Sequence, residues 1–356
     1  MKIIFVIPNL GSGGAERVIS ILSASFADQE ADVDIVLMHN KEIAYFISDK
    51  VNVIDFGMDL LFCSKRLSCK IMRDYFKKQK QEHDKIVIIP FHDSCLKRVL
   101  LSVSGLAIPV IACERNDPYQ KGTSMIAKTK ANLPYRMASH CVFQTPGASE
   151  YYDNYVQNKS TVIMNPLVMS ENIKWNGIES KRIVSVGRLE PQKNQMMLIE
   201  SFHRVHKEHP EYILEIYGEG SMREILQEKI NELQLDQCVF LRGHSSDIPK
   251  ILEESFLFVL SSDYEGLSNA LIEALAVGMP VITTDHPCGG AKILVQDGVN
   301  GILVSTGNAN EMASAMKQII QDHTFALRMG ENAYRTRELL SVDRIADEWL
   351  KVIMKL

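Results

Sequence analysis

Short apolar segments alternate with amphipathic segments along nearly the whole chain, and this alternation constrains the fold more than any other feature. A brief apolar run bounded by turn residues is typical of a buried strand, and the intervening stretches have helical spacing. Repeated strand–helix units predict parallel sheets in a doubly wound α/β architecture. The expected strands are residues 2–7, 33–38, 86–90, 109–113, 140–144, 181–186, 212–217, 238–241, 256–260, 280–284 and 301–304.

The strand–helix pattern restarts in the second half, which indicates two domains. A chain of 356 residues is long for one core, and Asn165-Pro166 is a turn signal between the halves. We therefore predict two Rossmann-like domains, residues 1–165 and 166–341, followed by a last helix near 342–355. In sheets of this kind ligands bind at the carboxyl ends of the strands, so we expect a cleft between the domains to hold the ligand.

Composition narrows the class of protein. Hydrophobic residues make up 46% and charged residues 23% of the chain, as in ordinary globular proteins. The net charge of −5 argues against nucleic acid as a partner. No apolar run approaches the length of roughly 18 residues that a membrane-spanning helix needs. The seven cysteines contain no C-x-x-C pair, which favours reduced thiols and a cytoplasmic location.

The segment 264–282, YEGLSNALIEALAVGMPVI, is the most informative motif for function. Glu265 and Glu273 stand eight positions apart around a turn, and residues 269–277 are expected to form a helix that Gly278 ends. The backbone amides of residues 266–269 (Gly266, Leu267, Ser268 and Asn269) would face outward at its N-terminus, where anions bind. Two carboxylates beside a phosphate site suit a sugar nucleotide. Helix capping with a solvated glutamate is the alternative.

Two other loops could contact phosphate. Gly13 and Gly14 follow the first strand and open a helix, which frees its N-terminus for an anion. A nicotinamide dinucleotide site would need a third glycine where the chain has Glu16, and a merely tight turn is the other alternative. After strand 181–186 comes the sequence GRLEPQKN, which carries Arg188 and Lys193. Cations at a strand end can bind phosphate oxygens, although solvated surface cations would give the same pattern.

These motifs together closely resemble retaining glycosyltransferases of family 4, which have the GT-B fold of two facing Rossmann-like domains. The resemblance covers essentially the full length and includes the A-x-G-x-P-V-I sequence after the second glutamate. It implies that Glu265 contacts the donor sugar and Glu273 the ribose hydroxyls. Arg188 and Lys193 would bind the diphosphate and neutralise the leaving group, so that no metal is needed. The expected donor is a nucleotide sugar, taken as a UDP-sugar.

The resemblance also implies further donor-binding positions and the roles of the domains. The first domain, with a crossover helix at 342–356, would lie on the acceptor side, and the second would bind the nucleotide sugar. Arg115 and Asn116 stand where family members place a histidine or another polar residue near the donor sugar, so a histidine role is in doubt here. The remaining implied donor-binding residues are Gly13, Gly14, Glu16, Gly187, Gly218, His244, Gly266, Leu267, Ser268 and Asn269.

A basic amphipathic segment at 61–80 suggests contact with a membrane. Apolar residues mark one helical face, and the cations crowd the rest of the helix. Such a helix favours an anionic membrane surface or a lipid diphosphate, but a helix packed in the core with a solvated basic face would look the same. The cations concerned are Lys65, Arg66, Lys70, Arg73, Lys77 and Lys78.

The sequence thus predicts a metal-independent retaining glycosyltransferase, peripheral on the inner face of the cell membrane. It would move a hexose or N-acetylhexosamine onto a polyprenyl-diphosphate-linked or polysaccharide acceptor in surface glycan biosynthesis. A GT-B-fold sugar-nucleotide epimerase and an inactive binding protein of the same fold are the alternatives. The sequence leaves open the donor sugar, the choice of UDP over GDP, the acceptor and linkage, and the oligomeric state.

Overall fold

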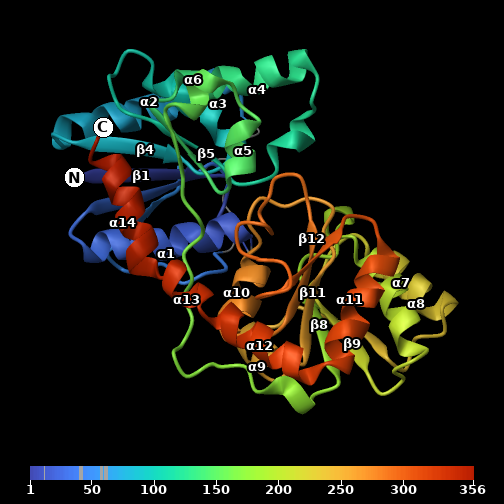
Figure 1. The fold of residues 1–356 in the computed structure, drawn as a ribbon. Coiled ribbons are helices and arrows are strands. Elements are labelled where there is room, and N and C mark those ends of the chain that lie inside the picture. The colour runs from blue at the N-terminus through green and yellow to red at the C-terminus, as the bar shows by residue number, and fades with distance from the viewer. Residues whose placement is uncertain (12, 40–42, 57–58, 60–62) are drawn as a thin grey trace. The chain divides into compact units, whose positions relative to one another are not determined.

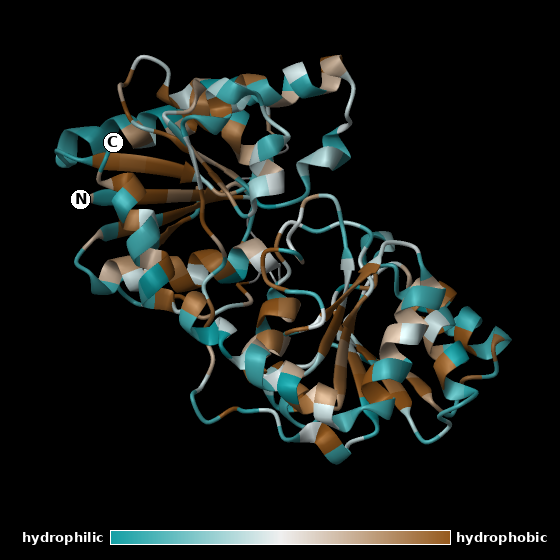
Figure 2. Cartoon of the chain, in the orientation of Figure 1, coloured by the Kyte–Doolittle hydropathy of each residue, from teal (hydrophilic) through white to brown (hydrophobic). Residues whose placement is uncertain are grey.

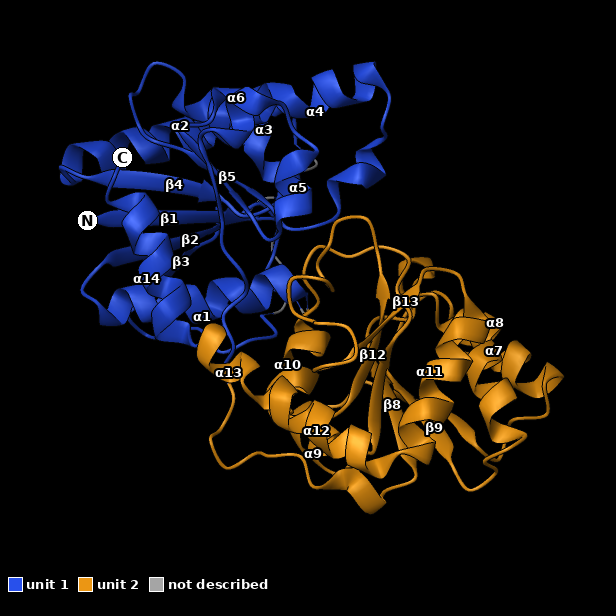
Figure 3. Ribbon diagram, in the orientation of Figure 1, with its two compact units in different colours: residues 1–168, 340–356 blue, residues 169–339 orange. Residues whose placement is uncertain are grey.

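The computed structural model describes residues 1–11, 13–39, 43–56, 59 and 63–356 (Figure 1). The chain forms two compact units, coloured separately in Figure 3. Unit 1 comprises residues 1–168 and 340–356, and unit 2 comprises residues 169–339.

Unit 1 is built on parallel strands covered by helices. One sheet has the order β3-β2-β1-β4 and a second the order β5-β6-β7, and a parallel bridge between Ile88 and Val110 lies between them. Its strands are β1 (Lys2–Ile7), β2 (Asp32–Leu37), β3 (Val51–Ile54), β4 (Ile86–Pro90), β5 (Ile111–Glu114), β6 (His140–Phe143) and β7 (Ser160–Val162). Its helices are α1 (Gly14–Asp28), α2 (Lys65–Glu82), α3 (Asp93–Val103), the 3₁₀ turn η1 (Pro118–Lys121), α4 (Met125–Met137), α5 (Pro146–Glu150), α6 (Asn154–Gln157) and α14 (Val342–Ile353).

Unit 2 contains a six-stranded parallel sheet of order β10-β9-β8-β11-β12-β13. Its strands are β8 (Arg182–Val186), β9 (Ile213–Tyr217), β10 (Val239–Gly243), β11 (Leu257–Leu260), β12 (Val281–Asp285) and β13 (Ile302–Ser305). Its helices are η2 (Gly177–Glu179), η3 (Pro191–Lys193), α7 (Gln195–His206), α8 (Arg223–Glu232), α9 (Ile248–Glu253), α10 (Asn269–Val277), α11 (Ala309–Gln321), α12 (His323–Tyr334) and α13 (Thr336–Leu339).

Most central strands of both units are largely apolar, as Figure 2 shows. β1 is buried at all six positions and β11 at all four, because helices cover both faces of a parallel sheet. The predicted α/β class with two parallel-sheet domains is confirmed. Each expected strand is present with its ends shifted by at most a few residues, whereas β3 and β7 were not predicted. These two are short edge strands with only one fully buried residue between them, so they lack an apolar run.

The units divide at slightly different residues from those the turn signals suggested. The boundaries lie between Val168 and Met169 and between Leu339 and Leu340, rather than at 165/166 and 341/342. The amide of Leu167 donates to the carbonyl of Leu340 at 2.7 Å, so the two connecting segments are paired side by side. Backbone pairing, which no local turn signal reports, therefore sets the junction.

Helix α14 returns the chain to unit 1. It packs against α1, and its Trp349 is fully buried with its ring 6.0 Å from the ring of Phe91. Among the described residues, no helix has the length and apolar character needed to cross a membrane.

Candidate functional site

The strand order of unit 2 reverses direction between β8 and β11, which creates a topological switch point. Strands β9 and β10 continue to one side of β8, while β11, β12 and β13 continue to the other. The loops that leave the carboxyl ends of β8 and β11 must diverge there, and ligands of doubly wound sheets bind in that position. The loops are residues 187–194 and 261–268, the two segments that carry the predicted catalytic side chains.

Lys193 and Glu265 meet at this switch point. The ammonium of Lys193 forms an ion pair with Oε1 of Glu265, and their side chains are only 14% and 10% exposed. The same carboxylate accepts hydrogen bonds from the Ser262 hydroxyl at 2.8 Å and the Gln192 amide at 3.3 Å. A nearly buried carboxylate needs such partners because removal from water penalises its charge. The sequence assigned both residues to the site but did not predict that they pair.

The backbone around Lys193 is fixed by the neighbouring loop. The carbonyl of Lys193 accepts from the Ser261 hydroxyl at 2.8 Å, and the carbonyl of Gln192 accepts from the amide of Asp263 at 2.9 Å. Asn194 has a left-handed backbone with φ of 44°, caps α7 through the amide of Met197, and donates to Asp263 at 2.8 Å. Asparagine tolerates this conformation and caps helices well, so its identity suits both tasks.

Helix α10 follows Glu265 as predicted. Gly266, Leu267 and Ser268 are buried, and the Ser268 side chain accepts from the amide of Leu271 as the N-cap. Glu273 lies in the second turn and is 5% exposed. Gly278 ends the helix with φ of 83°, as the Gly-Met-Pro sequence indicated. The carbonyl oxygen of Gly266 lies 1.8 Å from where a Cβ on Gly290 would stand, so loop 286–290 packs directly on the glutamate turn.

Three loops at this edge of the sheet approach each other through glycines. A Cβ on Gly218 would lie 2.0 Å from the carbonyl oxygen of Gly187, and one on Gly220 would lie 2.3 Å from that of Leu189. The amide of Gly218 donates to Gly243 at 2.8 Å, and the amide of Gly187 donates to Tyr217 at 2.9 Å. We call residues 187–189, 217–220 and 243 the glycine seam. The role of Gly187 and Gly218 seen here is close backbone packing.

Arg188 and His244 are exposed at the same edge. Hydrogen bonds from the amide of Ser221 at 3.2 Å and from its hydroxyl at 2.8 Å lower the pKa of Glu190, and the charge of Arg188 adds to this effect. Glu190 thereby ties the loop after β8 to the loop after β9. Arg188 projects from this braced loop, where an anionic ligand can reach it.

In unit 1, the glycine-rich loop has an unexpected neighbour. Gly13 is the N-cap of α1, and the first turn carries Glu16. A Cβ on Gly13 would lie 2.0 Å from Oε2 of Glu16, so this carboxylate folds back over the N-terminus of its own helix. A carboxylate is favourable there because of the helix dipole. Glu16 thus occupies the place where we expected a ligand anion beside Gly13 and Gly14.

Arg115 and Asn116 follow β5 in unit 1. The guanidinium of Arg115 stacks on Phe91, 4.4 Å from the ring centroid, and donates to Asn165 at 2.5 Å. Within the described part of the chain, its Nε and Nη1 atoms have no hydrogen-bond partner. Burial lowers the pKa of Arg115 to about 10. Asn116 is exposed.

Sequence reasoning missed a buried polar cluster next to Arg115. Glu114, 3% exposed, accepts from Lys121 at 2.5 Å, from Tyr152 at 2.7 Å and from Tyr135 at 3.1 Å. Burial opposes the charge of Lys121, but Glu114 and Asp93 outweigh it and raise the pKa of its ammonium. An acid that ends an apolar strand, as Glu114 does, is the one signal that could have indicated this cluster.

Helix α2 corresponds to the basic segment; residues 61–62 of that segment lie outside the described residues. Its apolar side is buried through Met72 and Phe76 and packs against α3. Arg73 donates to the carbonyls of Ser102 and Ser104 at 3.0 and 2.7 Å, so it holds the end of α3. The apolar face is therefore part of the core, and the exposed cations are Lys65, Arg66, Lys70, Lys77, Lys78 and Lys80.

The described ranges contain no group of three or more His, Cys, Asp or Glu placed to hold a metal ion.

Comparison with known proteins now identifies the class. Residues 170–336, nearly all of unit 2, match the family model of glycosyl transferases group 1. Unit 2 is therefore similar to this family, and the chain is a glycosyltransferase with the GT-B fold.

Two relatives from Campylobacter jejuni align over the whole chain. One is named GalNAc-alpha-(1->4)-GalNAc-alpha-(1->3)-diNAcBac-PP-undecaprenol alpha-1,4-N-acetyl-D-galactosaminyltransferase; it is 27% identical, with 99% of this chain and 98% of the relative covered. The other is named N-acetylgalactosamine-N,N'-diacetylbacillosaminyl-diphospho-undecaprenol 4-alpha-N-acetylgalactosaminyltransferase; it is 28% identical, with 99% of both covered. Among solved structures, Anabaena HepE in complex with UDP and glucose superposes with a TM-score of 0.81, at 19% identity over 100% of both chains.

Proposed function

We propose that this glycosyltransferase moves a hexose or N-acetylhexosamine from a UDP-sugar to a polyprenyl-diphosphate-linked or polysaccharide acceptor, with retention of anomeric configuration. The acceptor class is supported by the names of the two Campylobacter relatives, which specify undecaprenol-diphosphate-linked substrates. The donor class is supported by the complex of Anabaena HepE with UDP and glucose. Such a reaction belongs to surface glycan biosynthesis at the inner face of the cell membrane.

The observation that carries the proposal is the Lys193–Glu265 pair at the switch point of unit 2. A cation and a carboxylate held together in a nearly water-free position can bind different parts of a sugar nucleotide. The carboxylate of Glu265 would accept hydrogen bonds from sugar hydroxyls, while Lys193 and the exposed Arg188 would bind the diphosphate. The amides of residues 267–269 at the start of α10 would add donors for phosphate oxygens, and Glu273 would bind the ribose.

In the proposed step, the bond between the anomeric carbon and the diphosphate oxygen breaks, and its electron pair leaves with the diphosphate. The acceptor hydroxyl attacks the same face, and its proton passes to a diphosphate oxygen. Arg188 and Lys193 stabilise the negative charge that develops on the leaving group, so the reaction requires no metal. Fixed cations cost no reorganisation at the moment of reaction, and the braced loop 187–194 suits that role.

Unit 1 carries further residues that we propose bind substrate. The Nε and Nη1 groups of Arg115, which have no hydrogen-bond partner among the described residues, suit a substrate oxygen, with Asn116 next to them. Gly13 and Gly14 would approach the diphosphate only when the Glu16 carboxylate moves away from the helix N-terminus, because two anions repel there. His244 would lie near the nucleobase.

Binding of UDP is the first expected result. In a thermal-shift assay with UDP, GDP, ADP and CMP, UDP at about a hundred times its Kd should stabilise the protein by about 2.7 kcal/mol. The melting temperature should then rise by roughly 5–10 °C, and EDTA should not change this rise. A shift that EDTA removes would overturn metal independence. A larger shift with another nucleotide would reassign the donor, and the absence of any shift would contradict the donor site itself.

Replacing Glu265 and replacing Glu273 should have different effects on UDP binding and turnover. Glu273→Ala should weaken UDP binding by roughly tenfold, because it removes hydrogen bonds to the nucleotide in ground and transition states alike. Glu265→Ala should instead lower turnover more than affinity. Isothermal titration with UDP and donor-hydrolysis kinetics measure the two quantities. Glu253→Ala, on α9, is the matched control. Parent-like binding and turnover in both site variants would remove the paired-glutamate assignment.

A further inference from the structure

Helix α4 of unit 1 carries an apolar stripe that no described part of the protein covers. Ile126, Leu133 and Met137 are 69%, 61% and 60% exposed, and Met125 at the helix start is 84% exposed. Positions 126, 130, 133 and 137 follow helical spacing, so the three apolar side chains and Lys130 share one face. The opposite face is anchored by the fully buried ring of Tyr135. We call Met125, Ile126, Leu133 and Met137 the α4 stripe.

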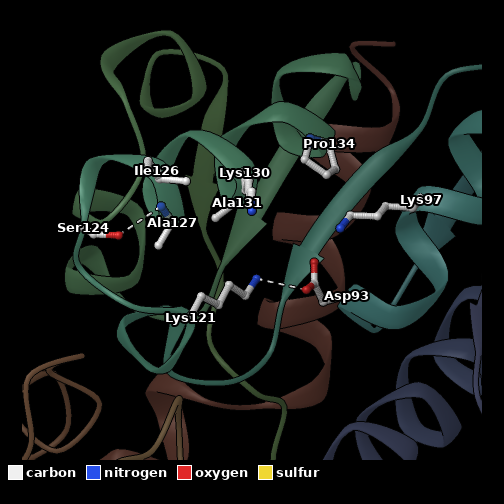
Figure 4. Close-up of a pocket in the computed structure, with 9 residues that line it drawn as sticks. All are labelled: Asp93, Lys97, Lys121, Ser124, Ile126, Ala127, Lys130, Ala131 and Pro134. Atoms are coloured by element: carbon white, nitrogen blue, oxygen red, sulfur yellow. Dashed lines mark hydrogen bonds and ion pairs between the residues drawn. The ribbon is translucent and has the colours of Figure 1, made fainter.

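A basic pocket adjoins the stripe. It has a volume of about 460 Å³ and lies between the start of α3, the loop after η1 and helix α4. Lys97, Lys121 and Lys130 line it, and Figure 4 shows their ammonium ends turned toward the same space. Lys121 is held by Asp93 at 3.2 Å. Lys97 and Lys130 are exposed, and within the described part of the chain neither forms an ion pair, so the pocket attracts anions.

The C-terminal end of the stripe has an aromatic and cationic border. Tyr155 on α6 is 55% exposed, with the Arg136 guanidinium 5.2 Å and the Lys159 ammonium 4.8 Å from its ring centroid. Aromatic rings with a polar end and long cationic side chains favour the boundary between lipid and water. Apolar side chains, lysines and an interfacial tyrosine therefore gather around one helix.

We propose that α4 is the membrane-docking element of this protein. The α4 stripe inserts among lipid chains, and the phosphate of an anionic phospholipid enters the pocket between Lys97 and Lys130. The positive charge of the pocket fits the phosphate of such a lipid, and the apolar stripe fits its hydrocarbon chains. This assignment extends the proposed function by naming the surface that reaches membrane acceptors. It differs from the sequence-based expectation, because the apolar face of α2 is in the core.

Vesicle binding tests the proposal without donor or acceptor. The purified protein is sedimented with phosphatidylcholine vesicles that contain or lack phosphatidylglycerol. The parent should bind the anionic vesicles, and Ile126→Glu with Leu133→Glu should lower its partition coefficient roughly tenfold or more. Lys97→Gln with Lys130→Gln should lower it roughly tenfold on anionic vesicles only. The matched control, Leu67→Glu with Leu101→Glu, alters two other exposed leucines, on α2 and α3, and should remain within about twofold of the parent.

Other outcomes would overturn the proposal. Parent protein that does not bind anionic vesicles contradicts it, as does equal loss in the stripe variant and its matched control. If Lys70, Lys77 and Lys78→Gln abolishes binding while the stripe variant binds normally, α2 is the docking element. A dimer in sedimentation velocity that the stripe variant dissociates would show that a second copy covers α4. Parent-like UDP shifts in all variants establish folding, and a parent that binds vesicles but not UDP would contradict the donor site alone.

Discussion

Replacing Lys193 with alanine is expected to lower turnover by roughly 100- to 1,000-fold, the range found when one preorganised charge-stabilising donor is removed from an active site. The effect should appear in kcat more than in KM, because charge on the diphosphate grows as the sugar leaves. Donor hydrolysis and transfer to acceptor, each at saturating donor, measure the loss. Lys250→Ala is the surface control, since Lys250 also pairs with carboxylates but is 52% exposed on α9. Activity within about threefold of the parent would disprove a catalytic role for Lys193.

Loss of the ion pair should also lower the stability of the protein, and this loss must be separated from the loss of turnover. Without Lys193, the nearly buried carboxylate of Glu265 keeps only Ser262 and Gln192 as hydrogen-bond partners among the described residues, which should destabilise the protein by about 3 kcal/mol. The double variant Lys193→Ala with Glu265→Gln removes the uncompensated charge and should recover most of that stability. Turnover should stay low in the double variant. Recovery of turnover together with stability would mean that Lys193→Ala is slow because of the uncompensated Glu265 carboxylate, and not because a cation is missing at the leaving group.

The sequence predicts the parts of this site that depend on local order. The Gly-Leu-Ser-Asn turn, the helix at 269–277 and its end at Gly278 all follow from capping preferences and apolar spacing, and α10 has these bounds in the structure. The cations after β8 are predicted from their place at the end of a strand, and Glu265 from its place on the turn before the helix at 269–277. Their convergence requires only the strand order of a doubly wound sheet.

Contacts between distant segments could not be predicted in this way. Lys193 and Glu265 are 72 positions apart, and nothing in either segment specifies that the two side chains pair. The buried cluster around Glu114 likewise joins β5 to residues from three other segments. The two amphipathic helices show the same limit. Helical spacing reveals the apolar face of α2, but only the packing of α3 shows that this face is buried while that of α4 is exposed.

The second large effect is expected from a substitution in the glycine seam. Gly218→Ala should destabilise the protein by about 3 kcal/mol or more and lower the melting temperature by roughly 6–12 °C. Two causes act together: the φ of 141° is one that residues with a Cβ rarely adopt, and the new Cβ would lie 2.0 Å from the backbone carbonyl of Gly187. Backbone cannot yield as a flexible side chain can. Differential scanning calorimetry of the whole chain measures the effect.

A matched glycine separates the two causes and connects stability to function. Gly298 has φ of 69° but no atom of the described residues within 4 Å of the added Cβ, so Gly298→Ala bears conformational strain alone and should cost about 1 kcal/mol. Relief of the Gly218 clash would displace residues 187–189 and with them Arg188, so Gly218→Ala should also weaken UDP binding, whereas Gly298→Ala should not. Equal losses in both variants would mean that backbone conformation, and not the close approach of the two loops, makes Gly218 necessary. In that case the loop after β8 would not depend on the seam for its position.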